Sequence, residues 1–216
     1  MKIKNSILLL VFVAFVYFAN GQIAGTPHDM SGKLWNTGTT NKLCGTCHVP
    51  HNSMVVGQAP LWSHDTSFAA YTMYTSAVSS TFNATPGTTP DGNSKLCLSC
   101  HDGTIALNDF IGAQSPVSGT IQVEYPGTSA FVGTNLSNDH PISFVYDAAL
   151  VSVDGGLHNP LTTLSGLTPS GTVDHDMLFN HKMQCASCHN PHDNTFTNFQ
   201  RMTNDASELC LKCHDK

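Results

Sequence analysis

One short motif occurs four times in the chain and constrains its fold more than any other feature. Each copy has two cysteines separated by two residues, with a histidine directly after the second cysteine. We number the copies in chain order as motifs 1 to 4, at residues 44–48, 97–101, 185–189 and 210–214. Together they use all eight cysteines of the 216-residue chain, so no thiol is left over for another role.

This spacing is the attachment signature of a c-type haem. In such a site the two thiols bond to the porphyrin and the histidine bonds to the iron. Zinc ribbons and disulfide scaffolds do not require a histidine after each cysteine pair, so four repeats favour haem over zinc or disulfides. The sequence therefore predicts four covalently attached haem c groups. The attachment residues are Cys44, Cys47, Cys97, Cys100, Cys185, Cys188, Cys210 and Cys213, and the proximal iron ligands are His48, His101, His189 and His214.

The first residues are typical of a secretory signal peptide. Lys2 and Lys4 precede an apolar run at residues 7–18, and small residues stand before a cleavage point ahead of Gln22. A membrane anchor is the alternative, but the run is shorter than the ~20 apolar residues that a bilayer requires. We expect residues 1–21 to be removed on export, after which no transmembrane segment remains. The expected location is extracellular or at the cell surface, with the periplasm as the alternative.

The charge of the chain excludes one class of partner. The formal charge is −6, and the loss of Lys2 and Lys4 with the signal peptide lowers it by two, to −8. The propionates of the haems add further negative charge. Because binding to nucleic acid depends on basic side chains that neutralise phosphates, we exclude nucleic acid as a partner.

Little chain is available to enclose four haems, at roughly one haem per fifty residues after export. Glycine, proline, serine, threonine and asparagine are frequent, and no long stretch has helical periodicity. The expected fold is mostly irregular coil with short α-helices at the motifs and a few short β-strands, wrapped around four closely packed haems. Alternating apolar residues predict strands at 120–125 and 142–146, which would form a small sheet or hairpin.

The four motifs fall into two kinds and indicate an internal duplication. Motifs 1 and 3, the A motifs, continue to a second histidine, His51 or His192, three residues after the proximal ligand. Motifs 2 and 4, the B motifs, have a leucine before the first cysteine and an aspartate after the histidine. The order A, B, A, B predicts a first two-haem module at 22–103, a haem-free connecting segment with short strands at 104–137, and a second two-haem module at 138–216.

Eight histidines remain as candidates for the second axial position of each iron. His51 and His192 emerge on the proximal side of their own haem, so each must reach a neighbouring iron. His28 and His140 stand upstream in their modules, next to aspartates that could orient a ring nitrogen. The residues alone leave His175 open as an alternative to His140. For His64, His158 and His181 the sequence favours a solvated position or a hydrogen bond to a propionate.

The sequence resembles the multihaem cytochromes with doubled Cys-x-x-Cys-His motifs. The likeness lies at residues 44–51, at Ala-Pro-Leu-Trp in 59–62, and at 95–103, 139–141 and 185–192. The chain is most similar to the secreted tetrahaem cytochromes that polymerise into conducting extracellular filaments. This resemblance implies histidine on both faces of every iron and favours His140 over His175. It also implies partners: other copies of the chain, and other redox proteins or an extracellular electron acceptor.

Electron transfer along closely spaced haems is the expected function, with the chain as the repeating subunit of a filament. A soluble periplasmic electron shuttle or an electron-delivery subunit is the alternative. A multihaem reductase is the weaker reading, because it needs an open iron position and all four motifs keep their histidine; we therefore do not expect an enzyme. His28, in a segment at 22–41 with little apolar material, could ligate iron in its own chain or in the next subunit.

Overall fold

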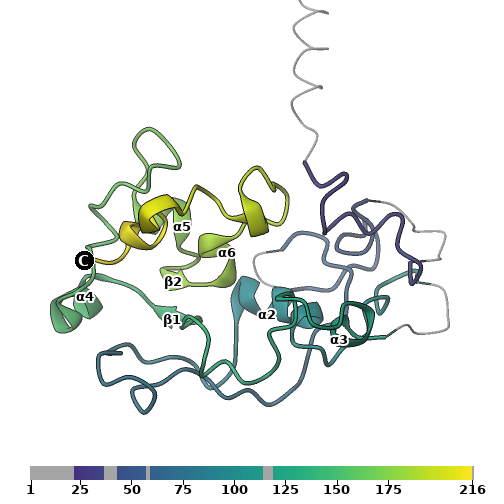
Figure 1. Ribbon diagram of the computed structural model, residues 1–216, viewed down its shortest axis with the longest axis horizontal. Coiled ribbons are helices and arrows are strands. Elements are labelled where there is room, and N and C mark those ends of the chain that lie inside the picture. The colour runs from purple at the N-terminus through teal and green to yellow at the C-terminus, as the bar shows by residue number, and fades with distance from the viewer. Residues whose placement is uncertain (1–21, 37–42, 57–58, 114–118, 216) are drawn as a thin grey trace, which may run out of the picture.

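Short helical segments separated by irregular chain make up most of the structure (Figure 1). The computed structural model describes residues 22–36, 43–56, 59–113 and 119–215, so the signal peptide expected at 1–21 lies outside the described residues. Within these ranges no helix has the length and apolar character needed to cross a membrane. The helices are α2 Gly92–His101, α3 Ile121–Glu124, α4 Ala148–Asp154, α5 Val173–Met177 and α6 Cys185–Cys188, followed by 3-10 turns at Thr197–Phe199, Asp205–Ser207 and Cys210–Lys212.

Two short strands form the sheet. β1 Phe144–Val145 pairs antiparallel with β2 Lys182–Met183, and Phe144 lies opposite Met183. Both of these side chains are buried, whereas Val145 is half exposed. The strand expected at 142–146 is therefore present in part, but its partner comes from the residues just before motif 3. This pairing brings the middle of the chain to the start of a haem-attachment motif.

The strand predicted at 120–125 is wrong, and so is the hairpin that it would form with 142–146. These residues form α3, in which the Tyr125 amide donates to the Ile121 carbonyl at 2.9 Å. The Glu124 carboxylate turns back to accept from the Gly119 amide at 3.1 Å. Local hydrogen bonds thus satisfy the backbone with no partner strand. The strand prediction failed because the alternating apolar residues do not share one buried face. Ile121 is buried, whereas Val123 is exposed.

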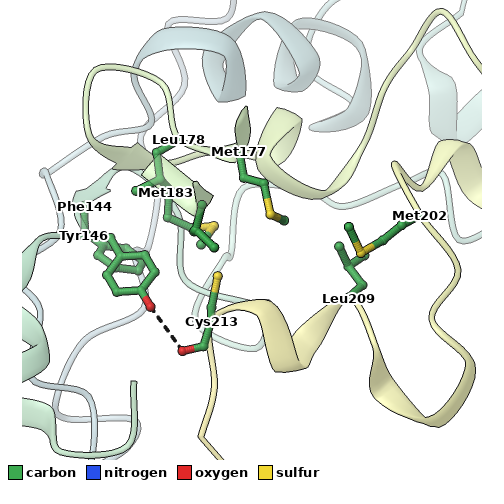
Figure 2. Close-up of a cluster of buried hydrophobic side chains, with 9 residues drawn as sticks. Phe144, Tyr146, Met177, Leu178, Met183, Met202, Leu209 and Cys213 are labelled. Carbon is green, nitrogen blue, oxygen red and sulfur yellow. Dashed lines mark hydrogen bonds between the residues drawn. The ribbon is translucent and has the colours of Figure 1, made fainter. Parts of the chain in front are cut away.

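The largest hydrophobic cluster lies in the second half of the chain and includes a haem-attachment cysteine (Figure 2). Tyr146 is almost fully buried, and its hydroxyl lies 2.6 Å from the His158 carbonyl and 3.1 Å from the Cys213 carbonyl. Phe82, from the predicted first module, packs against this cluster with its ring 5.6 Å from that of Phe144. The two predicted modules therefore share one core. Its buried members are Phe144, Tyr146, Val173, Met177, Leu178, Met183, Met202, Leu209 and Cys213.

A second cluster fixes the N-terminal segment to its own chain. Trp35 is buried with Leu107, Phe110 and Ile121. Its indole nitrogen donates to the Tyr125 hydroxyl at 3.4 Å. The sequence suggested that the segment at 22–41 had too little apolar material to be fixed in this way. Trp35 supplies that material, because one indole buries as much surface as several small side chains.

Motifs 2 and 3 are joined by buried polar contacts between α2 and the residues that lead into α6. Gln184 is buried, and its amide nitrogen donates to Asp91 at 2.7 Å while its amide oxygen accepts from the Ser94 amide at 3.2 Å. The Ser94 hydroxyl in turn accepts from the Cys185 amide at 2.9 Å. Lys182 forms an ion pair with Asp91. These contacts hold the first cysteines of motifs 2 and 3 side by side.

We predict that Gln184→Ala destabilises the haem-loaded protein by about 1–3 kcal/mol, because it leaves the Ser94 amide buried without an acceptor. Thermal unfolding followed by circular dichroism measures the change. Ser80→Ala, at an exposed position, is the control and should change stability by less than about 0.5 kcal/mol. Equal unfolding midpoints for the two variants would show that Gln184 does not hold the motifs together.

Candidate haem sites

Each motif folds into a turn of helix that places its cysteines and histidine on one face. In motif 1 the His48 amide donates to the Cys44 carbonyl at 2.9 Å, and in motif 3 the His189 amide donates to the Cys185 carbonyl at 3.1 Å. The corresponding bond in motif 4 is 3.0 Å, and motif 2 lies within α2. Side chains three and four residues apart share a helix face. A porphyrin bonded to both thiols therefore meets the proximal histidine of the same motif.

Backbone carbonyls orient the proximal imidazoles. The Nδ1 atom of His48 lies 2.8 Å from the Pro60 carbonyl, that of His101 lies 2.6 Å from the Ala130 carbonyl, and that of His189 lies 2.8 Å from the Asn198 carbonyl. A carbonyl only accepts, so Nδ1 carries the proton and Nε2 keeps its lone pair. This is the tautomer that ligates metal through Nε2, with the ring fixed from behind.

The Ala-Pro-Leu-Trp segment forms a frame around motif 1. The Val49 amide donates to the Leu61 carbonyl at 2.8 Å, and the Ser63 amide donates to the Cys47 carbonyl at 2.9 Å. Together with the His48 to Pro60 bond, these contacts hold the segment antiparallel to the motif. Trp62 lies edge-on to the His48 ring, with the ring centres 6.4 Å apart. The segment therefore fixes the direction in which His48 points.

The same frame surrounds motif 3, although its residues differ. The Asn190 amide donates to the Phe199 carbonyl at 2.7 Å, and the Arg201 amide donates to the Cys188 carbonyl at 2.9 Å. With the His189 to Asn198 bond, all three contacts of motif 1 recur at matching positions. Sequence reasoning missed this second frame, because it consists of hydrogen bonds to backbone carbonyls, which no particular side chain reveals. The recurrence supports the duplication hypothesis.

Three proximal histidines each face one of the histidines predicted as distal ligands. The ring centres of His48 and His192 are 6.1 Å apart, and those of His101 and His28 are 6.0 Å apart. The third pair, at a ring separation of 6.3 Å, is His214 with His140.

This common spacing provides a test of whether the residues fit haem iron. An imidazole nitrogen binds a metal ion at about 2 Å, so two rings on opposite sides of one ion have centres about 6 Å apart. The planes of the three pairs are inclined at 21°, 55° and 81°. Rotation about a common axis changes such an angle and leaves the spacing unchanged. All three pairs therefore fit an iron between them.

His28 is positioned by its own chain. Its ring stacks on Phe199, with centres 4.3 Å apart, and faces His101. Burial and, after it, the neighbouring His101 lower the pKa of His28 to about 4. The ring is thus neutral at pH 7, which is the form that binds metal. The structure places His28 against the first B motif of the same chain, not on a mobile arm.

His175, the alternative to His140, lies elsewhere. It is exposed, with its Nδ1 atom 2.8 Å from the Asp176 carboxylate, and His181 has the same relation to Asp174 at 2.7 Å. His140, by contrast, faces His214, and its Nδ1 atom lies 2.9 Å from the Pro141 carbonyl. The geometry favours His140 on grounds that are independent of the resemblance.

His64 does not match the solvated position favoured from the sequence. Its side chain is almost fully buried. Its Nδ1 atom lies 2.8 Å from the Asp65 carbonyl, and its Nε2 atom lies 3.4 Å from the sulfur of Cys100. The pattern missed this burial because the segment at 63–65 is held between Cys47 and residues 109–111 by backbone hydrogen bonds.

The thiols of Cys47, Cys100 and Cys213 do not suit zinc or thiolate sites. All eight cysteines are free of disulfides. Burial raises the pKa of Cys47, Cys100 and Cys213 to about 12, so these thiols are protonated at neutral pH. Zinc ligands and nucleophiles are thiolates. A structural zinc site also takes four protein ligands, and among the described residues no group of three or more His, Cys, Asp or Glu could hold a metal ion. Haem iron needs only two protein ligands.

Comparison with known families agrees with this chemistry. Residues 178–216, which contain motifs 3 and 4, match the family model described as Doubled CXXCH motif. This segment is a doubled CXXCH motif. The match supports the resemblance of the chain to multihaem c-type cytochromes, and CXXCH motifs indicate covalently bound haem c. A comparison with curated proteins found no match.

We predict that His140→Ala converts one haem of the loaded protein from low-spin to high-spin, because it removes the ring that faces His214. His175→Ala is the matched control and should leave the spin states unchanged, since its exposed ring faces Asp176. Electron paramagnetic resonance of the oxidised protein measures both. The opposite result, with a high-spin haem only in His175→Ala, would exchange the two assignments.

Proposed function

We propose that the chain is a tetrahaem c-type cytochrome that carries electrons outside the cytoplasm, with a histidine on both faces of each iron. The single observation that supports this most strongly is the common spacing of the three facing imidazole pairs. Haem supplies one-electron chemistry, because its iron cycles between the ferric and ferrous states. The protein itself has to hold the haems close together and orient the histidines that bind their iron.

The residues of the chain keep the axial positions filled. Carbonyls of Pro60, Ala130 and Asn198 hold three proximal rings from behind. His28, His140 and His192 face three of the proximal rings from the other side. An iron held between two such rings would have no open position for a substrate, which argues against a reductase. Its coordination would also change little when it gained an electron, which would favour rapid transfer.

The attachment cysteines of successive motifs lie close together. The Cys97 and Cys185 thiols share a hydrogen bond, which raises the pKa of Cys97. Cys100 adds to the rise in the pKa of Cys47, after burial, and Cys210 does the same for Cys188. Motifs 1 and 2, 2 and 3, and 3 and 4 are therefore neighbours. Haems attached at these cysteines would form a continuous series, as electron transfer requires.

The finer proposal is that copies of the chain assemble into an extracellular filament that passes electrons to other redox proteins or to an external acceptor. Support comes from the resemblance to filament-forming tetrahaem cytochromes and from the export typical of c-type cytochromes. Because His28 faces His101 of its own chain, we propose that filament assembly uses another contact. A periplasmic shuttle remains the alternative function.

We predict four covalent haems for each chain, all low-spin in the oxidised protein. The pyridine haemochrome assay measures the number of haems, and electron paramagnetic resonance measures their spin state. A high-spin haem that persists in the intact protein and binds a small oxyanion would instead establish the reductase.

Electron microscopy of the secreted fraction separates the filament from the shuttle. Filaments that contain the chain are the expected result, whereas monomers confined to the periplasm would establish the shuttle.

His28→Ala should still form filaments, with one high-spin haem for each chain, because His28 serves an iron in its own chain. Loss of the filaments in this variant, with the remaining haems intact, would place His28 at the subunit interface.

A further inference from the structure

Motif 3 differs from the other three motifs in one respect. Its proximal ring, His189, is oriented by the Asn198 carbonyl, as His48 and His101 are by the Pro60 and Ala130 carbonyls, yet among the described residues no imidazole ring faces it. We infer that His51 completes the iron site of motif 3, so that the two A motifs exchange their second histidines. The inference rests on the proposed function and assigns a ligand within it.

The matching frames of the two A motifs carry the inference. In each, one segment holds the motif through the same three hydrogen bonds, with Pro60, Leu61 and Ser63 in the first and Asn198, Phe199 and Arg201 in the second. His192 follows its proximal ligand by three residues, as His51 does. Because the frames match, the direction that takes His192 away from motif 3 takes His51 away from motif 1.

The observed half of the exchange fixes the relation between the motifs. The rings of His192 and His48 lie 6.1 Å apart and are nearly parallel, at 21°, so His192 of motif 3 reaches the proximal ring of motif 1. When two like surfaces meet about a twofold axis, each contact occurs twice: residue i meets j, and j meets i. The inferred exchange extends this twofold relation to the A motifs, and it would pair His51 with His189.

His51 is free to make this contact. The chain is tied on both sides of it, by the Val49 amide to Leu61 and by the Met54 amide to the Trp62 carbonyl at 2.8 Å. His51 lies in the short loop between these ties and is exposed. Asn52, with a φ of 58°, turns the chain there. The loop therefore presents its one imidazole to solvent, outside the hydrogen bonds of the frame.

The other spare histidines are held elsewhere. Both ring nitrogens of His64 are engaged inside the protein. His158 lies beside motif 4, where its amide donates to the Cys213 carbonyl at 2.8 Å. His175 and His181 are turned toward aspartates of α5.

The exchange predicts that neither half of the duplication can complete its own A site. The first module would supply the ligand for motif 3 and the second the ligand for motif 1. Two copies of an ancestral module could therefore have become one folded unit through their metal ligands, in agreement with the core that they share.

The test uses the full-length, haem-loaded protein. In His51→Ala we expect one haem in four to become high-spin and to bind carbon monoxide when reduced, and a crystal structure of this variant should find the open iron at His189. His51→Met keeps a ligand and should convert the same haem to histidine–methionine ligation, which gives a new near-infrared charge-transfer band. This variant replaces His51→Ala in the test if the alanine variant does not incorporate haem. His181→Ala is the control and should keep all haems low-spin.

Retention of four low-spin haems in His51→Ala overturns the inference, as does an open iron at any other motif. Failure of the proposed function looks different, because the unaltered protein would then already contain an open iron or fewer than four haems. The two failures therefore cannot be confused.

Discussion

The spacing between facing imidazole rings is the constraint on which the rest of the structure depends. Two imidazole rings held at this distance gain little from each other, so the protein has to hold each ring with other contacts. It does so with carbonyls at Pro60, Ala130, Asn198 and Pro141. A metal ion bound between the two rings would stabilise this arrangement, and metal binding would then be coupled to folding.

This constraint explains why so much of the chain is irregular. A carbonyl that must point at a particular nitrogen is placed more easily by a turn or an extended segment than by a regular helix, whose carbonyls are already used. The residues of the two frames include Leu61, Asn198 and Phe199, all with positive φ. Backbone strain of this kind persists where surrounding contacts determine the conformation. Here those contacts are the hydrogen bonds of the two frames.

The sequence predicted which histidines lie together better than it predicted the architecture between them. The motifs identify every cysteine and proximal histidine, because covalent attachment demands fixed spacing. His28, His140 and His192 could be proposed as distal ligands from their positions, and the structure brings each to a proximal ring. The frame around motif 3 and the burial of His64 could not be foreseen, since both depend on backbone contacts between distant segments. The strand predicted at 120–125 failed because apolar alternation in a short segment does not reveal whether a partner strand is available.

The claim that these pairs are iron sites is tested most directly by a high-resolution structure of the haem-loaded protein. The predicted result is one iron between His48 and His192, one between His101 and His28, and one between His214 and His140, each bound through Nε2. An iron at motif 1, 2 or 4 with a different second ligand, or with none, would contradict it.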